Sequence, residues 1–117
     1  MRRLETRLTP TLRGEFGSFW PDTTYAAALS RWAGSQPDKT AVVDGSRRLS
    51  YAQLDALVDR VAAGLAACGV GDSDVVSSQL PNVLESLVLC YATNRLGAIH
   101  NPIVPIYGAR EIRFILA

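Results

Sequence analysis

The side chain best suited to acid–base or nucleophilic chemistry is His100, because it is the single histidine of the chain. A serine nucleophile needs such a base, and the base needs an acidic partner that orients it. Gly71-Asp72-Ser73 offers a serine, but it precedes a predicted strand instead of following one, and His100 lies in no Asp-x-x-His sequence. These residues argue against a serine hydrolase. We interpret His100 as a half-buried polar residue beside a sheet end, with a role in a substrate pocket as the alternative.

Patterns that bind phosphate groups are equally sparse. Gly69-Val70-Gly71 could open a dinucleotide fingerprint, but Asp74 stands where the third glycine belongs, and the segment precedes a strand. No glycine-rich loop ends in a lysine, since Lys39 is the only lysine. The sequence therefore predicts no phosphate cradle of either type.

Metal ligands are also not indicated. Cys68 and Cys90 have no cysteine or histidine at metal-ligand spacing, so we interpret both as small buried hydrophobic residues in a reducing compartment. Asp72 and Asp74 are interpreted as solvated residues of a turn before a strand. We accordingly predict no catalytic, cofactor-binding or metal-binding residue within this chain.

Composition and charge describe a folded segment without a strongly charged partner. The 117 residues include 12 basic and 11 acidic side chains, with a net charge of +1, which excludes a generally basic nucleic-acid binder. Hydrophobic residues make up 48% of the chain, as in globular proteins. The longest uncharged stretch, 96–109, contains two prolines and is shorter than the about 20 residues of a membrane span. We expect a cytoplasmic protein with no transmembrane segment.

The clearest predicted helix begins after Ser50. Ser50 is a good N-cap, Gln53 completes a capping box three positions later, and Gly69 ends the helix. Asp55 and Asp59 fall on the polar face. The apolar stripe on the opposite face consists of Leu54, Leu57, Val58, Val61 and Leu65.

An earlier helix is predicted to begin after Asp22 or Thr23, both good N-caps, and to end near Gly34. Its apolar stripe consists of Tyr25, Leu29 and Trp32.

Two later helices complete the set. The helix predicted over 83–96, with Asn82 as its cap, is apolar nearly all round, so it should be covered on more than one side. The helix predicted over 108–117 should turn its apolar residues inward. These are Ile112, Ile115 and Leu116.

The strands indicate the fold class. Strands at 40–43 and 47–50 flank the turn Asp44-Gly45, which predicts a β-hairpin. Strands at 74–80 and 98–105 are separated by a helix, as parallel strands are. We predict an α/β protein, a partial layered fold in which helices pack on a mainly parallel sheet, with a short β-hairpin in addition.

Short sequence blocks follow one another along the chain in an order that resembles a known family. They are Ala28-Leu29-Ser30-Arg31-Trp32-Ala33, Gln36-Pro37-Asp38-Lys39-Thr40-Ala41-Val42-Val43, Leu49-Ser50-Tyr51-Ala52-Gln53-Leu54, Gly69-Val70-Gly71-Asp72, Val75-Val76-Ser77-Ser78-Gln79-Leu80-Pro81-Asn82 and Arg95-Leu96-Gly97-Ala98-Ile99-His100-Asn101-Pro102-Ile103-Val104-Pro105. The series resembles the N-terminal part of the AMP-forming acyl-CoA synthetases, which are adenylate-forming or AMP-binding enzymes. Residues 1–21 show no clear period and are predicted to form an N-terminal arm. By the resemblance, residues 22–117 form an N-terminal segment of an AMP-binding domain, truncated before the phosphate loop.

The resemblance implies a two-step reaction. A carboxylate attacks the α-phosphate of ATP–Mg²⁺ to give an acyl-adenylate, and the thiol of CoA then displaces AMP. The family uses a phosphate loop ending in Lys-Gly, a Tyr-x-x-Thr-Glu block, a ribose-binding aspartate and a C-terminal lysine, and none of these is in the sequence. We therefore expect the chain to be inactive alone and to bind ATP, Mg²⁺ and CoA poorly. His100, Asn101 and Pro102 are the residues closest to a substrate role, since the loop after them can approach the acyl side of the family's pocket.

The expected function is thus the N-terminal segment of an ATP-dependent carboxylate or fatty acid–CoA ligase, and whether these 117 residues act as an enzyme stays open. One alternative is a fragment of a peptide synthetase adenylation domain, and another is a non-catalytic interaction or assembly segment. The expected partners are a carboxylic acid substrate in the full-length family, and either a second copy of the chain or the complementary remainder of the enzyme. No nucleic acid is expected.

Overall fold

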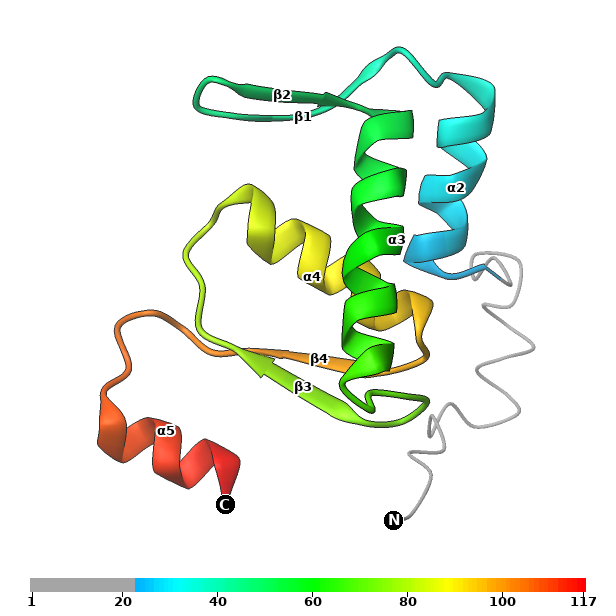
Figure 1. The fold of residues 1–117 in the computed structure, drawn as a ribbon. Helices are drawn as coiled ribbons and strands as arrows, with labels where there is room; N and C mark the ends of the chain where they lie inside the picture. The colour runs from blue at the N-terminus through cyan, green and yellow to red at the C-terminus, as the bar shows by residue number, and fades with distance from the viewer. Residues whose placement is uncertain (1–22) are drawn as a thin grey trace, which may run out of the picture.

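The fold alternates helices and strands along the chain (Figure 1). The computed structural model describes residues 23–117, so the predicted arm 1–21 and a helix start at Asp22 lie outside the described residues. The elements are α2 (Tyr25–Ser35), β1 (Thr40–Asp44), β2 (Arg47–Ser50), α3 (Tyr51–Ala67), β3 (Val75–Ser78), α4 (Leu84–Arg95), β4 (Ile99–Pro102) and α5 (Ala109–Leu116).

The strands form two separate pairs. β1 and β2 are antiparallel and pair Asp44 with Arg47 across the turn, where Gly45 has a φ of +57° that favours glycine. β3 and β4 are parallel and lie in register from the pair Val75–Ile99 onward. The α/β class, the hairpin and the parallel pair are confirmed, and within the described residues the parallel sheet has two strands.

Helix α3 forms as its sequence predicts. The Ser50 hydroxyl accepts from the Gln53 N–H at 3.3 Å, and the Gln53 side chain accepts from the Ser50 N–H at 2.9 Å, which confirms the capping box. Gly69 follows the helix with a φ of +89°. The buried residues of α3 are Leu54, Val58 and Ala62, whereas the other three members of the predicted stripe, Leu57, Val61 and Leu65, are half-buried.

Helix α2 differs from its prediction in its cap and in its buried face. Its N-cap is Thr24, whose hydroxyl accepts from the Ala27 N–H at 3.1 Å. Of the predicted stripe only Leu29 is buried, because Tyr25 is 74% exposed and Trp32 lies over Tyr51 with ring centroids 6.3 Å apart. The buried face is therefore narrower than the periodicity indicated.

Helix α4 lies between the hairpin and the parallel strands, and α3 crosses it (Figure 1). Its buried residues are Leu84, Val88, Ala92 and Thr93, and most of its other side chains are half-buried, as predicted for a helix that is apolar on all sides. The predicted cap Asn82 was wrong. The helix begins at Leu84, whose N–H donates to the Asp44 carboxylate at 2.9 Å, so the hairpin caps α4 from 40 positions away.

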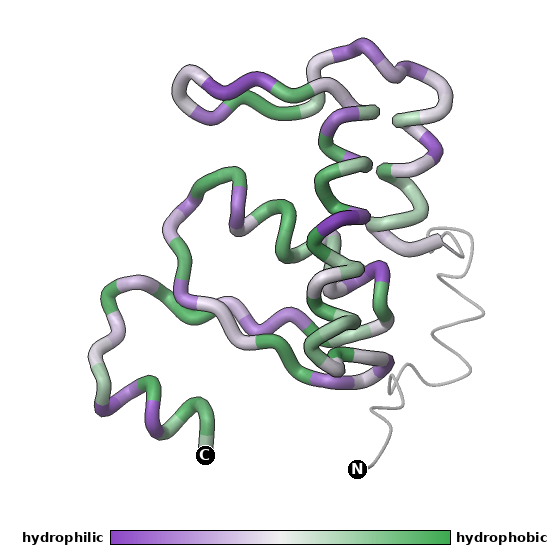
Figure 2. The backbone as a smooth tube through the Cα atoms, in the orientation of Figure 1, coloured by the Kyte–Doolittle hydropathy of each residue, from purple (hydrophilic) through white to green (hydrophobic). Residues whose placement is uncertain are grey.

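The prediction that α5 turns its apolar residues inward was also wrong for this chain. No residue of α5 is buried: Ile112 is half-buried, and Ile115 and Leu116 are 37% and 58% exposed. Figure 1 shows α5 apart from the other helices, and Figure 2 shows that it carries both apolar and polar residues. Within residues 23–117, the apolar face of α5 therefore stays largely uncovered.

The core position with the largest expected effect on stability is Leu54, which is 3% exposed. Leu54→Ala should lower the free energy of unfolding by about 2–5 kcal/mol, because it leaves a cavity in the packing between helices. The matched change Leu57→Ala should cost less, since Leu57 is only half-buried. Denaturant titration of the two variants measures the difference, and equal losses would contradict this assignment of the buried face.

The contact of the hairpin with α4 should make stability depend on pH. Arg47 donates to both Asp44 and Glu85, and this lowers the pKa of Glu85 from 4.5 to about 2. The pKa of Asp44 is also lowered, first by the Leu84 N–H and then by Arg47. Because the folded-state pKa is lower, the contact stabilises the fold fully above pH 4.5, and this stabilisation is lost as the pH falls toward about 2.

Glu85→Gln should therefore flatten the dependence of unfolding free energy on pH between 4.5 and about 2. Arg47→Met should flatten it as well, because the cause of the shift is removed. The control is Arg48→Met, since Arg48 makes no ion pair within residues 23–117. Unchanged pH dependence in the first two variants would show that the contact does not form in solution.

Candidate functional site

The residues singled out by the sequence, His100, Asn101 and Pro102, lie on β4 beside the carboxyl end of β3. The His100 Nε2 atom is 2.9 Å from the Ser78 hydroxyl, and the Asn101 side chain donates to the Ser77 hydroxyl at 3.1 Å. We call Ser77, Ser78, His100 and Asn101 the strand-end cluster. Ligands of open α/β sheets bind at the carboxyl ends of their strands, so this is the position where a substrate contact is expected.

The two hydrogen bonds of the strand-end cluster lie on opposite faces of the strand pair. Side chains alternate between the faces of a strand, so Ser77 and Asn101, which are register partners, share one face. Ser78 and His100 share the other face and meet diagonally, because Ser78 pairs with Pro102 in the register. The cluster therefore links the two strands from both sides and does not converge on one point.

The Ser78–His100 pair lacks the features of a nucleophile and its base. Burial lowers the pKa of His100, so its ring is neutral at pH 7. A catalytic histidine also needs a group that orients its second nitrogen, and within the described residues no carboxylate hydrogen-bonds to His100. The interpretation of His100 as a half-buried polar residue at a sheet end agrees with its position, and a direct role in a substrate pocket stays a prediction.

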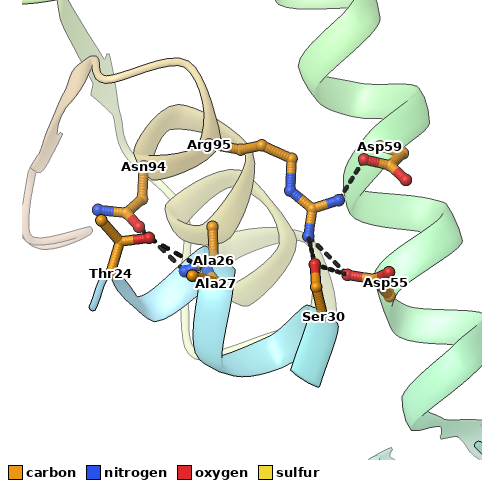
Figure 3. Close-up of polar contacts among 8 residues, drawn as sticks. All are labelled: Thr24, Ala26, Ala27, Ser30, Asp55, Asp59, Asn94 and Arg95. Atoms are coloured by element: carbon orange, nitrogen blue, oxygen red, sulfur yellow. Dashed lines mark hydrogen bonds and ion pairs between the residues drawn. The ribbon is translucent and has the colours of Figure 1, made fainter. Parts of the chain in front are cut away.

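A second polar cluster, which we call the Arg95 cluster, joins three helices (Figure 3). Arg95 at the end of α4 pairs with Asp55 at 2.6 Å and also with Asp59, both on α3. Its guanidinium donates to the Ser30 hydroxyl of α2 at 3.1 Å, and that hydroxyl donates to Asp55 at 3.0 Å. The neighbouring Asn94 accepts from the Ala26 N–H at 3.0 Å.

A hollow of about 450 Å³ lies beside the Arg95 cluster. Arg95, whose charge would attract an anion, is already paired with two carboxylates, and its side chain is 19% exposed. Burial acts to lower its pKa, but the hydrogen bonds to Asp55 and Asp59 outweigh burial and raise it. Two N–H groups of the first turn of α2 are bound by Thr24 and Asn94. This arrangement fits a structural junction and leaves no free cation for a ligand.

The Arg95 cluster was not predicted from the sequence, because Asp55 and Asp59 were assigned only to the polar face of their helix. Asp55 and Asp59 lie one turn apart on α3, and Arg95 ends a helix with few charges. Two aspartates one turn apart on one helix and a single arginine at the end of another could have indicated an ion pair between the two helices.

Four carboxylates of the described residues, those of Asp44, Asp55, Asp59 and Glu85, are paired with arginines, and no cluster of metal-ligating side chains is found within residues 23–117. We derive no catalytic step through a nucleotide or a metal in this chain.

Asp72 and Asp74 stabilise a turn, and the two cysteines form no disulfide within the described residues. Asp74 accepts from the Gly71 N–H at 2.8 Å, and Asp72 accepts from the Ser73 hydroxyl at 3.0 Å, in agreement with the interpretation as turn residues. Both cysteines are free thiols, as predicted, but Cys68 is exposed and Cys90 is half-buried, so the prediction that both are buried was wrong. Cys68 lies directly after α3, where the chain leaves the core.

Comparison with known proteins identifies the family. The profile of the AMP-binding enzyme family matches residues 29–117. The chain belongs to this family of adenylate-forming enzymes, as its sequence blocks indicated.

Individual relatives fall into two groups. The chain is 38% identical to the salicyl-AMP ligase / salicyl-S-ArCP synthetase of Mycobacterium tuberculosis, over 80% of this chain and 18% of that protein. The apo structure of Mycobacterium smegmatis MbtA matches with a TM-score of 0.80 and 34% identity, over 91% of this chain and 21% of that one. A Mycobacterium tuberculosis fatty acyl CoA synthetase matches with a TM-score of 0.75 and 36% identity, over 78% and 18%. The chain thus spans about a fifth of the length of these relatives.

The Arg95 cluster should contribute to stability. Arg95→Met leaves Asp55, whose side chain is 21% exposed, without its cation, and should lower the free energy of unfolding by about 1–3 kcal/mol. Asp59→Asn should cost less than about 1 kcal/mol, because the Asp59 side chain is 63% exposed and its pair with Arg95 is screened by water. Chemical denaturation compares the variants, and a loss for Asp59→Asn as large as that for Arg95→Met would refute this ranking.

Proposed function

We propose that this chain is the N-terminal segment of a cytoplasmic, ATP-dependent ligase that activates a carboxylic acid as its adenylate and transfers the acyl group to CoA. The supporting observation is the family match over residues 29–117, together with the resemblance of 101–111 to carboxylate–CoA ligases of the cyclohexanecarboxylate or short-to-medium fatty-acid kind. None of the described helices is long and apolar enough to cross a bilayer.

The segment supplies framework in this proposal, and the reacting groups lie elsewhere in the enzyme. The side chains that could carry chemistry are occupied with one another: His100 with Ser78, Asn101 with Ser77, and Arg95 with its two aspartates. Acyl-adenylate formation needs donors aimed at phosphate oxygens and a positioned metal ion. This chain alone should therefore not activate a carboxylate.

A second candidate is an adenylation enzyme that transfers its acyl group to a carrier protein. The observation that favours it is the similarity to a protein named as a salicyl-S-ArCP synthetase, at 38% identity, which is as strong as the similarity to a fatty acyl CoA synthetase, at 36%. If the reading frame continues 3′ of the Ala117 codon, the longer protein decides between the two. Acyl-CoA formation supports the first proposal, and acyl loading of a carrier protein without acyl-CoA supports the second.

The inactivity of the chain is directly testable. The purified 117-residue protein, incubated with ATP, Mg²⁺ and a panel of aliphatic and aromatic carboxylates, should give no pyrophosphate exchange above a blank. The salicyl-AMP ligase of Mycobacterium tuberculosis serves as the positive control with salicylate. Turnover that persists after host ligases have been removed would overturn the proposed division between framework and reacting groups.

A further inference from the structure

Gln79, the residue directly after β3, binds three backbone carbonyls with one side-chain nitrogen. Its Nε2 atom lies 2.8 Å from the Tyr107 oxygen, 3.3 Å from that of Val104 and 3.4 Å from that of Pro105. All three oxygens belong to the segment between β4 and α5, which we call the β4–α5 loop (residues 103–108). One side chain thus holds a loop that lies more than twenty positions further along the chain.

The chemistry of this contact requires a donor. Carbonyl oxygens only accept hydrogen bonds, so the three of them fix which end of the Gln79 amide faces the loop. The Val104 oxygen also accepts from the Tyr107 N–H at 3.0 Å, which closes a turn around the same point. The partial negative charges of three oxygens converge there, and the amide N–H groups of Gln79 offset them.

Beyond this contact the C-terminal part of the chain has few other attachments. The Ile103 N–H donates to the Ser78 oxygen at 2.7 Å, which ends the pairing of β4 with β3. The Gly108 N–H is bound locally, by Glu111 at 3.0 Å, and no residue of α5 is buried. The direction in which α5 leaves the sheet therefore depends on the conformation of the β4–α5 loop.

We propose that Gln79 is a positioning residue that fixes the β4–α5 loop, and through it α5, by donating to the carbonyls of Val104, Pro105 and Tyr107. This role is independent of the proposed function, since it concerns the order of α5 and not a reaction. It requires hydrogen-bond donors at position 79, whereas the length of the side chain matters less.

Three substitutions in the full chain distinguish the effect of hydrogen-bond donation by residue 79 from the effect of its side-chain size. Gln79→Met keeps the size and removes the donors, Gln79→Glu places a carboxylate against three oxygens, and Gln79→Lys supplies an ammonium group with three donors. Hydrogen exchange followed by mass spectrometry reports on peptides from 103–116, with peptides from α3 as the internal reference. Exchange in 103–116 should be about three- to tenfold faster in Gln79→Met and faster again in Gln79→Glu. Gln79→Lys should restore exchange close to that of the parent.

The control is Gln36→Met, because the hydrogen bonds of Gln36 within residues 23–117 use its backbone N–H and C=O groups, which the substitution leaves in place. This control should leave 103–116 unchanged. The proposal is overturned if Gln79→Met exchanges like the parent, if Gln79→Lys exchanges as fast as Gln79→Met, or if peptides from α3 accelerate by the same factor as those from 103–116. The last result would indicate general destabilisation of the fold.

Discussion

The attachment of helix α4 at both of its ends is the constraint on which the other elements depend. At its first residue the Leu84 N–H is bound by Asp44 from the hairpin, and at its last residue Arg95 reaches α2 and α3. Charges at both ends also complement the helix dipole, with Glu85 in the first turn and Arg95 in the last. Between these ends the helix packs against α3, which supplies the fully buried Val58. Displacing α4 would therefore release the hairpin and α2 together.

Local signals in the sequence predicted elements well, because the interactions that form them are local. The capping box of Ser50 and Gln53 and the turn at Gly45 each involve residues at most three positions apart. The N-terminus of α4 was predicted wrongly for the opposite reason. Asn82 has a side chain suited to capping, but the N-cap position is occupied by Val83, and an aspartate 40 positions away binds the Leu84 N–H. A single sequence contains no pattern that indicates a contact between residues so far apart along the chain.

The apolar periodicity of the sequence predicted burial only in part. The stripe of α3 contains the residues that face α2 and α4, but it overstates the burial of Leu57 and Val61. In α2 the aromatic side chains were predicted as core, whereas the small Ala26 is buried and Tyr25 is exposed. A close approach of two helices favours the small residue at the contact. Periodicity identifies the face of a helix, and it does not identify which residue on that face stands at the crossing.

In the candidate site, too, the strand could be predicted from local sequence, whereas the partners of its side chains could not. The sequence placed His100 and Asn101 at a sheet end, and their strand was predicted correctly. Their partners Ser78 and Ser77 depend on the register between β3 and β4, which single-sequence patterns do not specify. Within the described residues, no buried side-chain nitrogen or oxygen lacks a hydrogen-bond partner. Polar groups that satisfy one another are typical of a framework, while reactive sites keep groups available for a substrate.

The parallel pair β3–β4 has one further consequence. In the described part of the chain each of these strands is bonded on one side only, so both outer edges carry backbone N–H and C=O groups without strand partners. Such edges are templates for the addition of another strand. Val75 and Ile99, which are 51% and 37% exposed, add apolar surface beside them. A further strand added in register would satisfy backbone groups that helix packing cannot reach. Whether this segment aggregates through β-strand pairing therefore depends on whether these edges are covered.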